Sequence, residues 1–140
     1  MIARGFDGKD YKWSIHKRKF RQSATRPCSK NHLRARALLR ELFPRDTILE
    51  EVSLPGSKTQ TRNSILFADF YIPNRDLIVE VHGRQHYEYV SFFHKTKLDF
   101  YKAKARDRDK ADWCSINNIK IITLKYSDND NDWKRAILER

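Results

Sequence analysis

Two short apolar stretches, each carrying one acidic residue, constrain the fold of this chain more than any other feature. The stretch 65–72 carries Asp69 and the stretch 77–82 carries Glu80, and both are otherwise apolar enough for buried strands. Only four residues, Pro-Asn-Arg-Asp at 73–76, separate them, so we expect an antiparallel hairpin. Pairing the inner ends of the two stretches sets Asp69 opposite Glu80, with Cβ atoms roughly 5 Å apart.

Facing carboxylates in apolar surroundings are unfavourable unless something neutralises them. Each repels the other, and desolvation raises the free-energy cost of ionising both. A divalent cation shared by Asp69 and Glu80 would remove these penalties, and oxygen ligands of this kind suit Mg²⁺ or Mn²⁺. The alternatives are an edge pair open to solvent, one shared proton, or a register slip that separates the two groups. We predict a metal site.

Two histidines follow the second acidic stretch. Side chains alternate faces along a strand, so His82 lies on the face of Glu80. Gly83 permits a sharp exit from the strand, which would return Gln85 and His86 towards the carboxylates. A neutral imidazole can deprotonate an attacking water, and a charged one can stabilise or protonate a leaving oxygen. We predict catalytic roles for these residues, the alternative being that they are structural.

The remaining periodicity predicts an α/β domain. Ser29 is a good N-cap for a helix that runs to about residue 43 and is ended by Pro44. A strand at 47–54 precedes the hairpin, and a helix at about 98–117, a strand at 119–124 and a helix from about 132 follow it. The expected order is α-β-β-β-α-β with a final helix, in a single domain covering 28–140.

The charge of the chain points to an acidic partner. There are 29 Lys and Arg against 18 Asp and Glu, which gives a formal net charge of +11. Nucleic acid is the commonest partner of such a protein. Residues 1–27 read as a basic arm, whose Trp13 would stack on bases or cover the core, although a solvated tail fits equally. The side chains predicted to bind nucleic acid are Lys17, Arg18, Lys19, Arg21, Arg36 and Arg84.

Other sequence features concern the cellular setting. No apolar run is long enough to cross a bilayer, and the first residues lack the apolar segment of a signal peptide. The two cysteines, Cys28 and Cys114, form neither a disulfide framework nor a metal motif. We expect a cytoplasmic protein without a membrane partner, in a bacterial cell or encoded by a phage.

The pattern of an aspartate, a ten-residue gap and then Glu80-Val81-His82 resembles the PD-(D/E)XK nuclease superfamily. In that superfamily the third position of the second motif is usually lysine, and here it is His82. Asp69, Glu80-Val81-His82-Gly83, His86 and Arg106-Asp107 are more similar to very-short-patch repair and phage homing-type endonucleases, which use histidine in place of that lysine. The resemblance covers about residues 29–126 and implies a restriction-endonuclease-like fold with an αβββαβ core, in which helices flank a mixed sheet.

The resemblance also implies a role for each matching position. Asp69 would be the principal metal ligand, joined by the Val81 carbonyl and by Glu80. His82 or His86 would activate water, and Asp107 would orient a histidine or a water. On the first helix, relatives often have Ser-x-x-Glu where this chain has Ser29-Lys30-Asn31-His32, so His32 is a further catalytic candidate, with a core histidine as the alternative.

We therefore predict a metal-dependent DNA endonuclease, of homing, repair or restriction type, that requires Mg²⁺ or Mn²⁺ and acts as a monomer or homodimer. DNA binding of this kind would weaken strongly with added salt. One alternative is an inactive DNA-binding or recruitment module on the same fold, which the change from lysine to histidine favours. Another is a junction resolvase or an RNA-directed nuclease.

Overall fold

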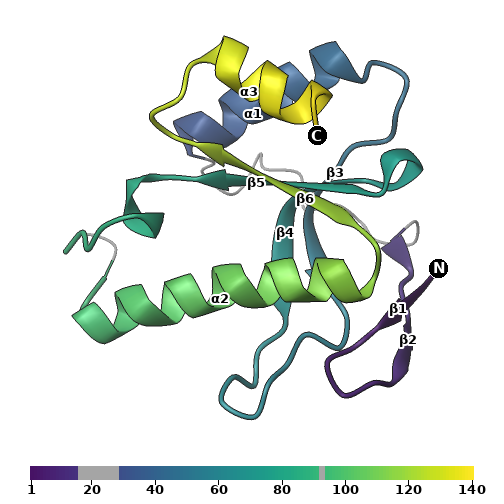
Figure 1. The fold of residues 1–140 in the computed structure, drawn as a ribbon, viewed down its shortest axis with the longest axis vertical. Helices are drawn as coiled ribbons and strands as arrows, with labels where there is room; N and C mark the ends of the chain where they lie inside the picture. Colours follow the sequence, from purple (N-terminus) through teal and green to yellow (C-terminus); the bar gives the residue numbers. More distant parts are fainter. Residues whose placement is uncertain (16–28, 92–93) are drawn as a thin grey trace.

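The centre of the fold is a sheet of four strands in the order β3-β4-β5-β6 (Figure 1). The structure is a computed structural model that describes residues 1–15, 29–91 and 94–140. Strands β3 (Leu49–Leu54), β4 (Leu66–Ile72) and β5 (Leu77–His82) are antiparallel, and β6 (Lys120–Lys125) is parallel to β5. A parallel neighbour needs a crossover connection, which the helix between β5 and β6 provides. The predicted mixed sheet is confirmed.

Helices cover both faces of this sheet. Helices α1 (Lys30–Leu42) and α3 (Asp130–Leu138) lie on one face, and α2 (Lys97–Ile116) lies on the other (Figure 1). Two single 3₁₀ turns, η2 (Pro73–Arg75) and η3 (Arg84–His86), precede and follow β5. The fold is therefore mixed α/β, and its order from α1 to α3 is the predicted one.

The helices begin where short polar side chains cap them. Ser29 Oγ accepts the His32 N–H at 3.0 Å, as its predicted role requires. Thr96 and Asp99 form a reciprocal capping box at the start of α2. Asn129 caps α3, so the helix begins at Asp130, two residues earlier than the sequence pattern indicated. These local bonds satisfy backbone N–H groups that have no partner inside the helix.

The first fifteen residues are part of the domain. Strands β1 (Ile2–Arg4) and β2 (Asp10–Lys12) form a hairpin, and Trp13 packs in the same apolar cluster as α2. The Trp13 ring stacks on Tyr71 at 4.8 Å between centroids and meets Trp113 edge-on at 5.2 Å. Trp13 therefore covers the core, one of the two roles expected of it in the basic arm of residues 1–27. Its basic residues, Lys17, Arg18, Lys19 and Arg21, lie outside the described residues.

The sheet loses its regular alternation beside Asp69. In β3, both Leu49 and Val52 contact the core under α2, although they are three residues apart. Glu51 lies between them with a φ of 51°, a left-handed conformation that costs free energy for a residue with a side chain. Ala68 and Tyr71 show the same irregular spacing in β4. This irregularity places Asp69 in a locally distorted part of its strand.

Candidate functional site

The acidic hairpin forms in the predicted register. The ladder between β4 and β5 pairs Ile72 with Leu77 and ends with Phe70 opposite Val79. Beyond that point, carboxylates take the place of backbone acceptors. Glu80 Oε2 accepts the Asp69 N–H at 2.7 Å, and Asp69 Oδ2 accepts the Val81 N–H at 2.8 Å. The two acidic residues are therefore joined through backbone N–H groups, at the point where the strands stop pairing.

Glu80 has a cationic partner that the sequence analysis missed. The Lys110 ammonium on α2 forms an ion pair with Glu80 Oε1, and Glu80 is only 2% exposed. Burial raises the pKa of Glu80 to about 8, the Asp69 charge adds to this, and Lys110 opposes it. Burial works against the charge on Lys110, but the carboxylates of Glu80 and Asp69 raise its pKa overall. A protein cation therefore relieves part of the repulsion on which the metal prediction rested.

A simple helical signal could have found this lysine. Ala111 follows Asp107 by one turn and would continue an apolar helix face in the sequence, but it is exposed. Lys110 lies three residues after Asp107 and four before Cys114, and residues at those spacings share a helix face. A prediction based on an apolar stripe does not include a lysine on the same helix face.

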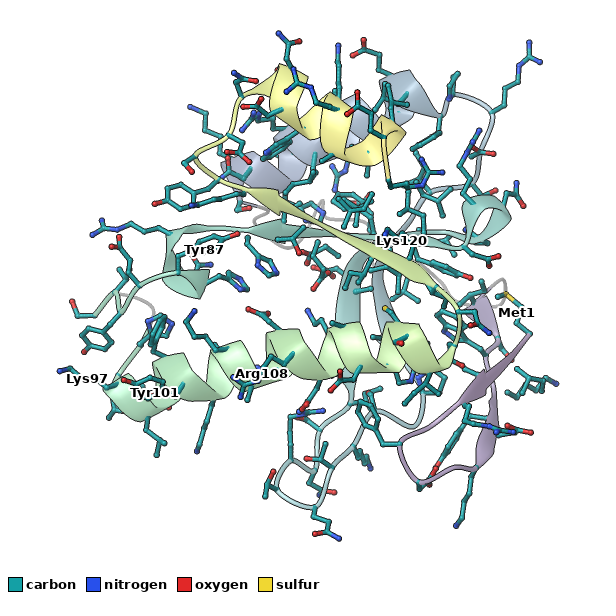
Figure 2. The ribbon with its side chains drawn as sticks, in the orientation of Figure 1. Met1, Tyr87, Lys97, Tyr101, Arg108 and Lys120 are labelled. Atoms are coloured by element: carbon teal, nitrogen blue, oxygen red, sulfur yellow. The ribbon has the colours of Figure 1, made fainter. Side chains whose placement is uncertain are left out.

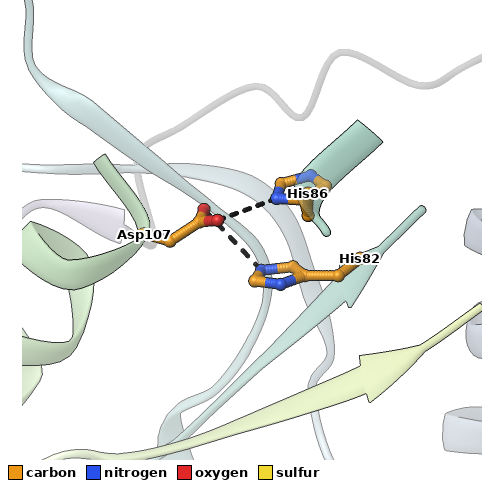
Figure 3. A group of neighbouring side chains, drawn as sticks. All are labelled: His82, His86 and Asp107. Carbon is orange, nitrogen blue, oxygen red and sulfur yellow. Dashed lines mark hydrogen bonds and ion pairs between the residues drawn. The ribbon is translucent and has the colours of Figure 1, made fainter. Parts of the chain in front are cut away.

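The two histidines converge on one carboxylate from α2 (Figure 3). His86 Nδ1 lies 2.9 Å from Asp107 Oδ2, within hydrogen-bonding distance. His82 Nε2 lies 3.8 Å from Asp107 Oδ1, which makes it an ion-pair contact and not a hydrogen bond. The two rings are stacked, with centroids 4.0 Å apart and planes inclined by 10°. The structure therefore unites three of the predicted catalytic residues.

The electrostatics of this group differ between its members. Burial lowers the pKa of His82 to about 4, and the charge of His86 adds to this, although Asp107 opposes it. Burial works against the ionisation of Asp107, but the His86 hydrogen bond and the charges of both histidines lower its pKa overall. His82 is therefore neutral and Asp107 ionised near pH 7.

Gln85 belongs to the same segment, and Gly83 makes room for it. A Cβ atom on Gly83 would lie 2.5 Å from Gln85 Oε1. Gly83 has a φ of −77°, which any residue can adopt. Glycine is therefore needed here because a side chain would not fit, and not because of its backbone freedom. Arg84 is exposed and paired with Glu88, four residues on. The turn η3 thus presents Gln85 and His86 beside β5.

His32 and Arg36 lie on the other face of the sheet. His32 Nε2 is 2.7 Å from Glu50 Oε1, and its ring stacks on Phe70 at 4.5 Å. Arg36 binds the same carboxylate, with Nη2 at 2.8 Å from Oε1. Burial works against the ionisation of Glu50, but Arg36 and His32 lower its pKa overall. Neither residue joins Asp107 and the histidine pair in the structure.

The depressed pKa of His82 predicts acid sensitivity. Between its folded pKa of about 4 and its ordinary value of 6.5, the unfolded chain binds more protons at this site, so stability falls as the pH drops through that window. Between pH 7 and 4.5 we expect His82 to account for about 2 kcal/mol of lost unfolding free energy. Urea unfolding of the wild type and His82→Gln at both pH values measures this. Equal losses in the two proteins would show that the imidazole is not shielded from protonation.

Comparison with known proteins identifies viral relatives of part of the chain. It is 36% identical over 76 residues to "Uncharacterized protein 307L" of Invertebrate iridescent virus 6, covering 54% of this chain and 39% of that protein. It is 35% identical over 82 residues to "Uncharacterized protein 094L" of Frog virus 3, covering 58% and 53%. The chain thus matches about two fifths to one half of the length of these relatives.

Other comparisons give no match. No family model matches the chain, and no solved structure matches it. Among the described residues, no helix combines the length and apolar character needed to cross a membrane.

Proposed function

We propose that this chain is a metal-dependent nuclease domain that hydrolyses phosphodiester bonds in DNA. The observation that carries the proposal is that Asp69 accepts the Val81 N–H of β5, while the His86–Asp107 pair lies against the next residue of that strand, His82. His82 links the two groups, since the charges of both Asp69 and Asp107 act on it. We also propose that the fold is restriction-endonuclease-like and related to the PD-(D/E)XK superfamily. The order α1-β3-β4-β5-α2-β6 and the mixed sheet support this assignment.

The residues around Asp69 fit a hard divalent cation. The N–H and C=O of one strand residue point to the same side, so the Val81 carbonyl faces β4 as its N–H does. A carboxylate oxygen of Asp69 and the Val81 carbonyl oxygen are ligands that suit Mg²⁺ or Mn²⁺. Both oxygens of Glu80 are already bonded, to the Asp69 N–H and to Lys110. Glu80 therefore serves mainly to hold the Asp69 backbone and Lys110 in position.

The His86–Asp107 pair fits the role of a general base. With Asp107 accepting the Nδ1 proton, the Nε2 atom of His86 is left as an acceptor. That nitrogen takes a proton from water as the water oxygen bonds to phosphorus, the bond to the leaving oxygen breaks, and solvent protonates the leaving oxygen. Asp107 keeps the ring oriented and stabilises the imidazolium that forms. A bound Mg²⁺ would supply positive charge against the charge developing on the phosphate oxygens.

The surface beside the site is suited to a polyanion. Exposed cations follow α2 and the residues just before it, namely Lys95, Lys97, Lys102, Arg106 and Arg108. Exposed Tyr101 lies on the same helix, and exposed Tyr87 follows η3 (Figure 2). Basic side chains bind phosphates, and aromatic rings stack on bases. These features favour DNA over a small substrate.

Plasmid cleavage tests the proposal. Purified protein should convert supercoiled plasmid to nicked or linear DNA with Mg²⁺ or Mn²⁺, and EDTA should abolish the conversion. An inactive binding module would shift the plasmid in a gel with or without the metal and would never cut it. That result, obtained across a range of metal concentrations and DNA sequences, would refute the nuclease assignment.

A further inference from the structure

We propose that His82, His86 and Asp107 form a binding site for a transition-metal ion such as Zn²⁺, distinct from the Mg²⁺ position at Asp69. Their candidate ligand atoms all lie within 4.8 Å of one another (Figure 3). Imidazole nitrogens suit Zn²⁺, Co²⁺ and Cu²⁺, whereas Mg²⁺ prefers oxygen ligands in octahedral geometry. Two nitrogens and one carboxylate therefore select a different class of ion.

The distances fit an ion of this size. Ligands about 2.1 Å from a tetrahedral Zn²⁺ lie about 3.4 Å from one another. The observed separations fall on either side of that value, with His86 Nδ1 at 2.9 Å from Asp107 Oδ2 and His82 Nε2 at 3.8 Å from Asp107 Oδ1. One imidazole would have to rotate out of the stacked pair, because a metal ion lies in the plane of each ring that binds it. The three side chains would then supply three ligands, and the fourth position would remain open to water.

His82 directs a ring nitrogen at Asp107. Its side chain is only 11% exposed. Among the residues that the structure describes, none forms a hydrogen bond with this ring, although Nε2 faces a carboxylate oxygen at 3.8 Å. An ion held between this nitrogen and Asp107 would satisfy both.

The surrounding charge also favours a divalent cation. Asp69 on β4, Glu80 on β5 and Asp107 on α2 act on the group together with the Lys110 ammonium. Asp69 and Asp107 against the one ammonium leave the region negative when the histidines are neutral, even with Glu80 protonated. The ammonium is also committed to Glu80. A divalent ion at the three residues would therefore lower the repulsion among the carboxylates.

Occupation of this site has a consequence that rests on the proposed function. The bound ion would take the lone pairs of His82 and His86, so neither ring could accept a proton from water. Zn²⁺ would then inhibit Mg²⁺-dependent cleavage without competing for the Asp69 carboxylate. Binding of Zn²⁺ to the histidine pair would thus inhibit the hydrolytic site.

Titration with Co²⁺ tests binding without reference to activity, because Co²⁺ absorbs visible light when nitrogen ligands bind it in a protein. We expect one equivalent to bind and Zn²⁺ to displace it. His86→Asn and Asp107→Asn should each weaken binding by at least about 10-fold, since each removes a ligand. Asp69→Asn removes a nearby charge but no ligand and should weaken binding by less than about 10-fold. His32→Asn, the matched control on the opposite face of the sheet, should leave affinity within about threefold.

The outcomes separate this proposal from the nuclease assignment. If plasmid is never cut but Co²⁺ binding follows the pattern above, the metal site stands and the nuclease assignment fails. If Co²⁺ binding survives in both His86→Asn and Asp107→Asn, or is lost in Asp69→Asn, the proposed site is wrong. Circular dichroism of each variant shows whether it is folded. Because two ligands are substituted independently, the test remains valid if one of the variants does not fold.

Discussion

Asp69→Asn should reduce Mg²⁺-dependent DNA cleavage by about 1,000-fold or more while leaving the fold intact. Asparagine keeps the shape of the side chain, and its oxygen can still accept the Val81 N–H that Asp69 Oδ2 accepts at 2.8 Å. The negative charge is lost, however, and with it most of the attraction for a divalent cation. Removing that charge also relieves the repulsion on buried Glu80, so the unfolding free energy should not fall. Single-turnover plasmid cleavage and urea unfolding measure the two effects.

Asp112→Asn is the matched control for this substitution. Asp112 is exposed on α2, and it undergoes the same chemical change away from the site. Its cleavage rate should stay within about threefold of the wild type. DNA affinity measured without metal should be nearly equal in all three proteins, because the basic surface is unchanged. Full Mg²⁺-dependent activity in Asp69→Asn would show that this carboxylate has no role in hydrolysis.

Lys110→Met should destabilise the domain by about 1–3 kcal/mol at pH 7, because it leaves the buried Glu80 carboxyl without its partner. The loss should grow at alkaline pH. The pKa of Glu80 is about 8 with Lys110 in place and rises when that cation is removed, so above pH 8 the wild type gains stability from an ionised pair that the variant cannot form. Urea unfolding at pH 7 and pH 9 measures both effects.

Two further variants isolate the ion pair. Adding Glu80→Gln to Lys110→Met removes the unpaired acid and should recover most of the unfolding free energy that Lys110→Met loses at pH 9. Lys102→Met makes the same substitution at an exposed position of α2 and should change stability by less than about 0.5 kcal/mol. If Lys110→Met behaved like Lys102→Met at both pH values, the pair would not be buried as the structure shows.

The hairpin and the order of elements were predictable because their signals are local. A four-residue connection sets the register of β4 on β5, and alternation along β5 places His82 on the face of Glu80. Capping residues such as Ser29 mark where helices begin, so the start of α1 was predicted correctly. Each of these features depends on residues close together in the sequence.

The features that sequence analysis missed depend on contacts between distant segments. Lys110 reaches Glu80 across 30 positions of the chain, and its place on the helix face does not reveal this distant partner. His32 fits the pattern of a catalytic helix residue, but Glu50 of β3 and the ring of Phe70 hold it on the other face. Trp13 was equally suited to stacking on bases, and only its neighbours in the core determine its role.

The most direct measurement of the central claim is the anomalous scattering of Mn²⁺ in crystals of the wild-type protein bound to DNA. We expect a Mn²⁺ peak about 2.1–2.2 Å from an Asp69 carboxylate oxygen and from the Val81 carbonyl oxygen, with His86 Nε2 directed at a water beside the phosphate. An absence of density at Asp69 in crystals that bind Mn²⁺ only elsewhere, with the phosphate far from both histidines, would contradict the account.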